Sequence, residues 1–253
     1  MKNALNQLAI DHMYYVNLES STEKNEHCIN LFAEHELDVE RVDAVNDSGY
    51  TSTGQMLATY KAQNQSVINT LKDAIANGYK RIAIFEDDVM FTDDAAQVLA
   101  ESVARTTERK YFIDDESRPI YVLDDTGEST DEITGYEQKE EIEMVAHIPD
   151  NWDFLTLGCL ANGPPSYHIG GRVWGLSYCA LAHANLYKET MFQPIIDELE
   201  KMEAPYDMCV AKVFRDFDKY KAIGILYKGI AYQKAGFRSD NLKIDNYDNS
   251  EVT

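Results

Sequence analysis

The apolar residues of this chain fall into short runs that alternate with stretches of helical periodicity. A helical stretch at residues 56–76 ends at Asn77 and Gly78, a pair that commonly terminates helices. A run of strand length, residues 82–85, follows at once. Other segments of strand character are residues 13–18, 39–42, 152–158 and 223–227. Strands that alternate with helices predict an α/β fold with a mostly parallel central sheet flanked by helices.

Further helices are expected between these strands. A capping signal at residues 20–23 predicts a helix that extends toward Phe32. Helices are also expected at residues 182–187 and 194–202 and after Pro205. At 253 residues, the chain is expected to form a single catalytic-size domain, residues 1–253.

The regular alternation is interrupted at about residues 104–148, where acidic residues accumulate with few basic ones between them. We interpret this segment as an insertion in the form of a flap or hairpin. Residues 111–113 and 120–123 could pair as two short strands around Arg118 and Pro119. A solvated surface excursion is favoured over direct substrate binding, because charged runs usually face water.

Three acidic residues stand directly after the apolar run at residues 82–85. In open α/β sheets, ligands bind beyond the carboxyl ends of such strands, where Glu86, Asp87 and Asp88 are expected. Side chains alternate along an extended backbone, so Glu86 and Asp88 project to the same side, and two close carboxylates repel unless a proton or a cation lies between them. A divalent cation that carries a diphosphate satisfies this pattern. The alternative is that these acids cap the next helix or face water.

The formal net charge of −21 limits the partners of the protein. A nucleic-acid backbone or an anionic lipid surface would be repelled, so neither is an expected partner. A nucleotide diphosphate meets the same repulsion and needs a bound cation or a local basic pocket. No apolar run is long enough to span a membrane, and the first residues lack the apolar stretch of a secretory signal, so a cytoplasmic protein is expected.

Cysteine and histidine spacing gives little support for zinc. The four cysteines, Cys28, Cys159, Cys179 and Cys209, form no Cys-x-x-Cys pair and are expected to be reduced packing residues. The six histidines form no His-Glu-x-x-His pattern or comparable cluster.

Several segments, taken in order, resemble glycosyltransferase family 25, which includes lipooligosaccharide and collagen hydroxylysine galactosyltransferases. The resemblance covers nearly the whole chain except the acidic insertion, and its most specific part is Glu86-Asp87-Asp88 in its setting. The segments that carry it are residues 15–19, 41–45, 78–89, 152–158, 170–175 and 205–207, followed by Gln233, Ser239 and Asp240.

This resemblance implies a GT-A glycosyltransferase fold and inverting transfer of galactose or a related hexose. The donor would be a UDP-sugar, the metal Mn²⁺ or Mg²⁺, and the acceptor a saccharide or another hydroxylated molecule. It also implies that Asp88 is a direct metal ligand, that Glu86 or Asp87 orients the ribose or a metal-bound water, and that Glu86 and Asp240 belong to the metal site.

The other roles implied by the resemblance concern the donor and the acceptor. The strand residues Tyr15, Val16, Asn17 and Leu18 would flank the uracil, with Asp43 near the same edge, and Lys61 or Arg81 could approach the phosphates. Glycines around Gly171 let a backbone approach a ligand closely, and Trp174 could stack on a sugar or simply pack. Asp207 is the candidate base that removes the proton of the acceptor hydroxyl; the alternative is a helix N-cap.

Two departures from the family pattern bear on these roles. A frequent Ser-His pair is replaced by Ala58 and Thr59, which weakens any specific donor assignment. No histidine follows His183, so Asp240, Ser239, Gln233 or water would have to complete the metal site.

Two other functions stay open on the sequence. A nucleotidyltransferase would also present acids to a metal-bound nucleotide, although the chain lacks a glycine-rich, lysine-containing phosphate loop near its first strand. A non-catalytic carbohydrate-binding protein derived from a glycosyltransferase is the other alternative.

Overall fold

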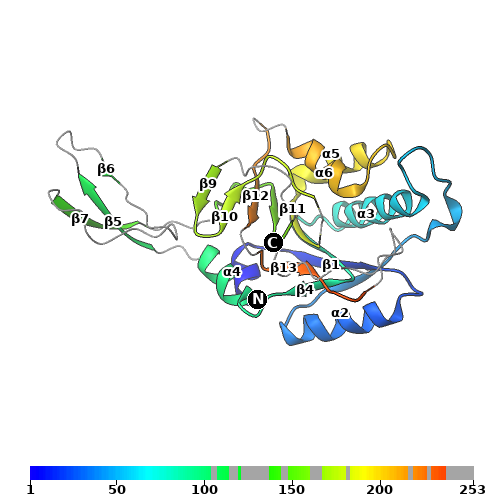
Figure 1. Ribbon diagram of the computed structural model, residues 1–253, viewed down its shortest axis with the longest axis horizontal. Helices are drawn as coiled ribbons and strands as arrows, with labels where there is room; N and C mark the ends of the chain where they lie inside the picture. Colours follow the sequence, from blue (N-terminus) through cyan, green and yellow to red (C-terminus); the bar gives the residue numbers. More distant parts are fainter. Residues whose placement is uncertain are drawn as a thin grey trace.

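The computed structural model describes residues 1–103, 107–113, 119–120, 137–143, 148–159, 167–180, 183–215, 219–226 and 229–237. Its centre is an eight-stranded sheet of order β2-β1-β3-β11-β8-β12-β10-β9 (Figure 1). In chain order these strands are β1 (His12–Asn17), β2 (Glu40–Asp43), β3 (Arg81–Glu86), β8 (Phe154–Thr156), β9 (Tyr167–Gly170), β10 (Val173–Gly175), β11 (Ala184–Lys188) and β12 (Ala222–Ile225). The helices are α1 (Lys2–Gln7), α2 (Thr22–Glu34), α3 (Ala58–Ala76), α4 (Ala95–Val103), α5 (Glu189–Leu199) and α6 (Tyr206–Phe214), with a 3-10 turn, η1 (Asp47–Gly49).

Most strands of the central sheet run in one direction. β1 is parallel to β2 and β3, and β8 is parallel to β12. β11 is antiparallel to both β3 and β8, so β8 and β12 share the direction of β3. β10 opposes β12, and β9 reverses again. The predicted α/β class is confirmed, in a mixed sheet in which β10 and β11 run against the other strands.

Helices cover both faces of this sheet. Figure 1 shows α3, α5 and α6 on one side and α2 on the other. The side chains of β3 alternate between two separate hydrophobic cores. Ile82 and Ile84 pack in the cluster under α3 and α5, whereas Ala83 and Phe85 pack in the cluster that includes residues of α2 and α4. A strand buried on both faces explains the uninterrupted apolar run in the sequence.

The predicted helix at residues 182–187 is wrong, because residues 184–187 belong to β11 in the middle of the sheet. Ala184 and Leu186 are fully buried in one core, and Tyr187 packs into the other. A short apolar run does not distinguish a buried strand from a buried helix by its periodicity. The following helix, α5, begins at Glu189 rather than near Pro194, which lies inside it.

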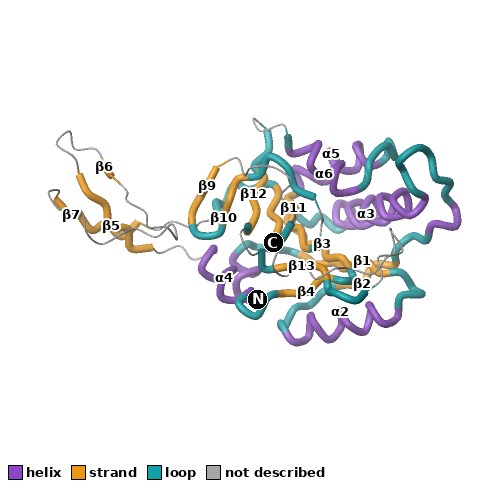
Figure 2. The backbone as a smooth tube through the Cα atoms, viewed as in Figure 1, coloured by secondary structure: helices purple, strands orange, loops and turns teal. Residues whose placement is uncertain are grey.

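Two smaller sheets complete the described strands. β4 (Val89–Phe91) pairs with β13 (Ala231–Gln233), so the apolar residues after the acids join a late segment of the chain (Figure 2). In the insertion, β5 (Thr107–Ile113) pairs with β6 (Pro119–Ile120) near the predicted position. β5 also pairs with β7 (Glu137–Glu143), which the sequence pattern did not indicate, and residues 121–123 lie outside the described part.

The amino ends of the strands are tied together by polar contacts. Asp11 accepts the backbone N–H groups of Lys80 and Arg81, and Arg81 donates to the carbonyl of Leu8 at 2.7 Å. At the same edge, Asp153 accepts the N–H of Lys221 at 2.9 Å. We call this edge, defined by these six residues, the amino edge.

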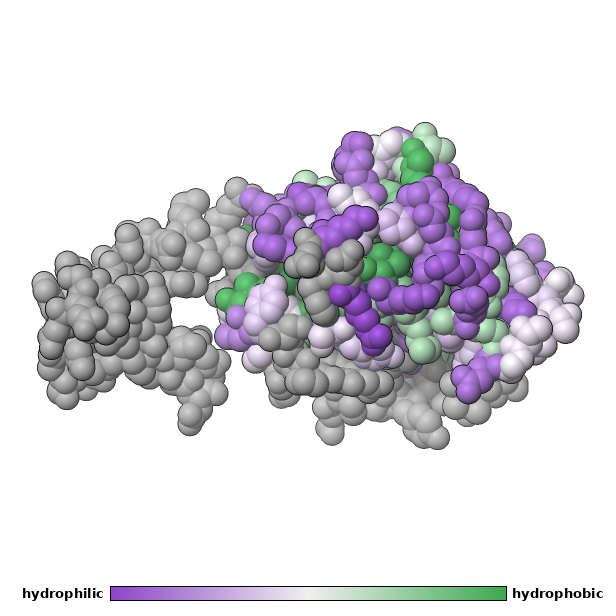
Figure 3. Space-filling model, turned by 90° about the horizontal axis from the view of Figure 1, so that it is seen from above, coloured by the Kyte–Doolittle hydropathy of each residue, from purple (hydrophilic) through white to green (hydrophobic). Residues whose placement is uncertain are grey.

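The outer surface is largely polar where it can be seen. Figure 3 shows a predominantly hydrophilic face on the side of α5 and α6. None of the described helices is long and apolar enough to cross a membrane.

Candidate functional site

The site lies at the carboxyl ends of β1 and β3. Because β11 runs against β3, the beginning of β11 lies beside the end of β3, and the N–H of Glu86 donates to the carbonyl of His183 at 3.0 Å. β1 ends beside the same point with Asn17. Side chains from three separate segments therefore converge at this edge of the sheet.

Glu86, Asp88 and His183 form a group that could bind a metal ion. Each offers one ligand atom, and these atoms all lie within 4.8 Å of one another. Nδ1 of His183 lies 3.5 Å from Oε2 of Glu86. The imidazole is fully buried, and within the described part of the chain neither of its ring nitrogens makes a hydrogen bond. Carboxylates and imidazole are ordinary ligands of divalent transition metals, so the donor set fits such an ion.

Asp87 is bound differently from its two neighbours. One of its carboxylate oxygens accepts from Nδ2 of Asn17 at 2.8 Å, and the other lies 3.2 Å from Nζ of Lys24 in α2. Its backbone carbonyl accepts from the thiol of Cys28, whose pKa is raised by burial and by the carboxylates of Asp87 and Asp88. Asp87 thus anchors the acidic turn to β1 and α2.

Glu86 and Asp88 are each held by a second contact. Nε2 of Gln63 in α3 donates to Oε1 of Glu86 at 3.1 Å. Nε2 of Gln233 in β13 lies 3.5 Å from Oδ2 of Asp88, and the N–H of Lys234 donates to the carbonyl of Asp88 at 2.7 Å. Helix α3 and strand β13 therefore support the acidic turn from outside it.

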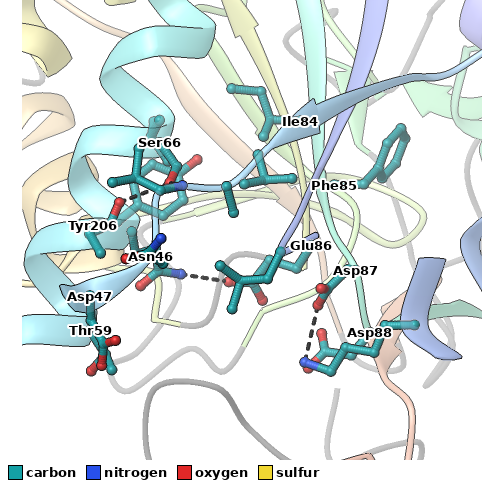
Figure 4. Close-up of a pocket in the computed structure, with 18 of the residues that line it drawn as sticks. Asn46, Asp47, Thr59, Ser66, Ile84, Phe85, Glu86, Asp87, Asp88 and Tyr206 are labelled. Atoms are coloured by element: carbon teal, nitrogen blue, oxygen red, sulfur yellow. Dashed lines mark hydrogen bonds and ion pairs between the residues drawn. The ribbon is translucent and has the colours of Figure 1, made fainter. Parts of the chain in front are cut away.

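A pocket of about 310 Å³ opens above these acids (Figure 4). One wall comes from the end of β1 and the loop after β2, and another from the first half of α3. Within the described part of the chain, the lining contains both apolar and polar side chains, and Lys24 is its one basic residue. The lining residues discussed below are Val16, Leu18, Lys24, Asn46, Asp47, Gln63, Ser66, Glu86, Asp87, Asp88, Tyr206 and Gln233.

The walls of the pocket are fixed by hydrogen bonds. Oγ of Ser66 accepts the N–H of Val45 at 2.9 Å and donates to the carbonyl of Ala62 at 2.8 Å, which ties the loop after β2 to α3. Tyr206, at the start of α6, contacts the hydroxyl of Tyr187 through its own hydroxyl. Burial raises the pKa of Tyr206, so its hydroxyl stays protonated near neutral pH.

The structure divides the β1 residues of the predicted uracil site between two faces. Val16 and Leu18 line the pocket, whereas Asn17 does not line it and donates to the carboxylate of Asp87. Tyr15 points into the opposite core, where its ring packs near Phe32 and its hydroxyl donates to Asn25 at 2.8 Å. The alternation of side chains along a strand accounts for this division.

Other residues considered from the sequence do not line this pocket. The Asp43 side chain is exposed and pairs with Arg41. Lys61 donates to the carbonyl and hydroxyl groups of the loop at residues 51–53. Arg81 belongs to the amino edge, at the other end of β3 from Glu86.

The later candidates either do not line the pocket or lie outside the described residues. Asp207 follows Tyr206 and accepts the N–H of Met208 at 2.8 Å, but it is not part of the pocket lining. Gly171 lies in the turn between β9 and β10. Trp174 packs against His168, with their ring centroids 4.5 Å apart. Ser239 and Asp240, considered for the metal site, lie outside the described residues.

His183 is the candidate metal ligand that sequence reasoning missed. It is a single histidine before a short apolar run, in a segment whose local pattern favoured a helix. Its position beside Glu86 arises from the antiparallel pairing of β11 with β3, which no local signal indicates. Recognising β11 as a central strand would have been the necessary first step.

Comparison with known proteins does not assign this chain to a family. Neither a search of protein-family models nor a search of curated proteins finds a match for this chain.

Proposed function

We propose that this protein is a metal-dependent glycosyltransferase of the GT-A fold that uses a UDP-sugar donor. The observation that carries the proposal is the grouping of Glu86, Asp88 and His183 at the carboxyl end of a central strand, where Glu86 and Asp88 also line a pocket. The resemblance to glycosyltransferase family 25 adds support, because two of the segments that suggested it, residues 15–19 and 78–89, meet at this pocket.

Glu86, Asp88 and His183 are the residues that would hold the metal. The buried imidazole, with no hydrogen bond to the described residues, fits a ligand role better than a packing role, since buried polar groups are ordinarily paired. A divalent cation, when bound, stabilises the negative charge that develops on the departing diphosphate.

The charge of the pocket supports cation-dependent binding of a nucleotide. Among the described residues, four carboxylates line it, from Asp47, Glu86, Asp87 and Asp88, against the one ammonium group of Lys24, which leaves an excess of three negative charges. A diphosphate would be repelled by this lining unless a cation lay between them. Lys24 is moreover paired with Asp87, which reduces its field in the pocket.

The chain's own groups account for binding and proton removal. The apolar side chains of Val16 and Leu18 and the polar ones of α3 offer surfaces for the nucleoside. Asp207 is the proposed base, which takes the proton of the acceptor hydroxyl as that oxygen attacks the anomeric carbon with inversion. Galactose or a related hexose is the proposed transferred sugar, and a saccharide or hydroxylated molecule the acceptor.

The proposal is tested by titrating UDP calorimetrically in the presence of Mn²⁺ and in the presence of a chelator. Affinity should be much higher with Mn²⁺ for the wild type, and Asp88→Asn should remove most of the difference. Asp197→Asn is the matched control, because Asp197 is exposed on α5 and accepts from Nε2 of Gln193 at 2.7 Å. Equal UDP affinity with and without metal would contradict the proposal.

A panel of donors separates the proposal from its alternatives. Metal-dependent release of UDP from a UDP-sugar, with transfer to an added saccharide, is expected of a glycosyltransferase. Turnover of nucleoside triphosphates with release of pyrophosphate would identify a nucleotidyltransferase instead, and sugar binding without turnover a carbohydrate-binding protein.

A further inference from the structure

Glu86 is held between two side chains that come from different elements. Its Oε1 accepts from Nε2 of Gln63 at 3.1 Å, and its Oε2 lies 3.5 Å from Nδ1 of His183. A carboxylate accepts hydrogen bonds but donates none, so the NH₂ group of Gln63 must be the end that faces it. One oxygen is therefore engaged by α3, and the other is directed toward the histidine.

Helix α3 is itself fixed at the level of Gln63. Nδ2 of Asn64 donates to the carbonyl of Ala204 at 2.9 Å, which joins α3 to the segment before α6. Ser66 joins α3 to the loop after β2 through Val45. Gln63 and Ser66 are three residues apart and thus share one face of the helix, the face that lines the pocket.

We infer that Gln63 is a positioning residue for Glu86, an inference that rests on the proposed metal site. By occupying Oε1, the amide selects the orientation in which Oε2 faces His183. A hydrogen bond to an ionised carboxylate is about twice as strong as one between neutral groups, so it restricts this side chain effectively. Gln63 contacts no metal in this role and acts only through Glu86.

The inference predicts a specific loss of metal affinity. Partners of metal ligands typically contribute roughly 10- to 100-fold to affinity. Gln63→Met removes the donor and keeps the length of the side chain, so Mn²⁺ should bind about 10-fold or more weakly in calorimetric titrations without nucleotide. Gln63 is only partly buried, so the unfolding temperature in chelator should change little.

Gln65 offers a matched control on the same helix. Its Nε2 donates to Oδ1 of Asn69 at 2.9 Å, and it does not line the pocket. Gln65→Met removes the same chemical group from α3 and should leave Mn²⁺ affinity unchanged. Gln63→Ala provides a second variant that lacks the donor, and it should show a loss similar to that of Gln63→Met.

A double-mutant cycle with Glu86→Gln tests whether Gln63 acts through Glu86. If it does, the double variant should bind Mn²⁺ about as weakly as Glu86→Gln alone, because the interaction is already lost. Additive losses would overturn the inference, as would wild-type Mn²⁺ affinity in Gln63→Met. Weaker UDP binding in chelator with unchanged Mn²⁺ affinity would also overturn it, since Gln63 would then contact the nucleotide.

The same titrations separate this inference from the proposed function. A wild-type protein that binds Mn²⁺ while Gln63→Met binds it equally well leaves the metal site in place and rejects only the role of Gln63. A wild-type protein that binds no Mn²⁺ rejects both.

Discussion

Lys24 and Asp87 form a buried ion pair, with Nζ of the lysine 3.2 Å from Oδ1 of the aspartate. Their side chains are only 9% and 12% exposed. Asn17 donates to the second oxygen of the same carboxylate, so the charge of Asp87 is balanced from β1 and α2 together. Asp87 therefore stabilises the turn, while the side chains of Glu86 and Asp88 lie close to His183.

Lys24→Met should lower the free energy of unfolding by about 3 kcal/mol, because removal of one partner leaves a buried charge without its counterion. Urea unfolding at neutral pH measures this difference. Lys72→Met is the control: Lys72 pairs with Glu200 at the surface, where a single ion pair contributes at most about 1 kcal/mol. Equal losses in the two variants would show that the burial of the Lys24 pair has no energetic consequence.

His183→Leu should weaken Mn²⁺ binding by at least about 10-fold, since even the outer partners of metal ligands contribute that much. In chelator, however, the variant should be at least as stable as the wild type. The buried ring nitrogens make no hydrogen bond to described residues, and replacing such a group with an apolar one can be neutral or stabilising. Thermal unfolding with chelator and with Mn²⁺ distinguishes the two effects. A large loss of stability in chelator would mean that His183 serves the fold rather than a metal.

Asp207→Asn should reduce kcat for sugar transfer by about 100-fold or more while UDP affinity stays unchanged, as expected for loss of a general base. Asp207 is not part of the pocket lining, so the acceptor would approach from the side of α6. Steady-state transfer and calorimetry with UDP give the two quantities, and Asp197→Asn serves again as control. Normal transfer by Asp207→Asn would place the base elsewhere.

His27 should make the protein less stable in mild acid. Its Nε2 lies 2.8 Å from the carbonyl of Val89, and its Nδ1 lies 3.3 Å from Nζ of Lys234. Burial lowers the pKa of His27, the contact with Val89 opposes this, and the neighbouring ammonium lowers the pKa further. The folded-state pKa is thus below the unfolded value of about 6.5, so this stability is present above that pH and is lost as pH falls through the folded-state pKa.

The measurement is urea unfolding at pH 7 and pH 5 for the wild type and for His27→Gln. The wild type should lose more stability between the two pH values, because its histidine must take up a proton beside Lys234. Identical losses would show that His27 titrates normally in the folded protein.

Gly158→Ala should destabilise the fold by about 3 kcal/mol, as overpacking in a rigid region does. A Cβ at this position would lie 1.8 Å from the carbonyl oxygen of Ala231 and 2.8 Å from its carbon, so the backbones of two segments would have to separate. Gly49→Ala is the control, because nothing lies within 4 Å of the corresponding Cβ. Urea unfolding compares the two, and similar midpoints would contradict the close approach at Gly158.

The parts of the fold that could be predicted are those with strong local signals. The helix that ends at Asn77 and the strand that leads into Glu86 follow from periodicity, a helix stop and an apolar run, and both are confirmed. β11 could not be recognised in this way, because burial on both faces removes the periodicity that separates strand from helix.

The site shows the same limit. Glu86 and Asp88 were expected on the same side of an extended strand; in the structure Glu86 ends β3 and Asp88 lies in the turn before β4, and their closeness follows from their separation by one residue. His183 joins them only through the order and direction of β3 and β11, so its place depends on tertiary structure. Tyr15 illustrates the converse, since the segment was correctly identified as a strand but the face of each side chain was not distinguished.

The separation of the amino edge from the pocket has a practical consequence. Arg81 and Glu86 stand at opposite ends of β3, and Lys221 lies with Arg81, so a fluorescent label at Lys221 would be attached far along the strands from the acids. Such a label would report on unfolding of the sheet without touching whatever occupies the cavity, which would allow ligand affinity and conformational stability to be followed in one sample.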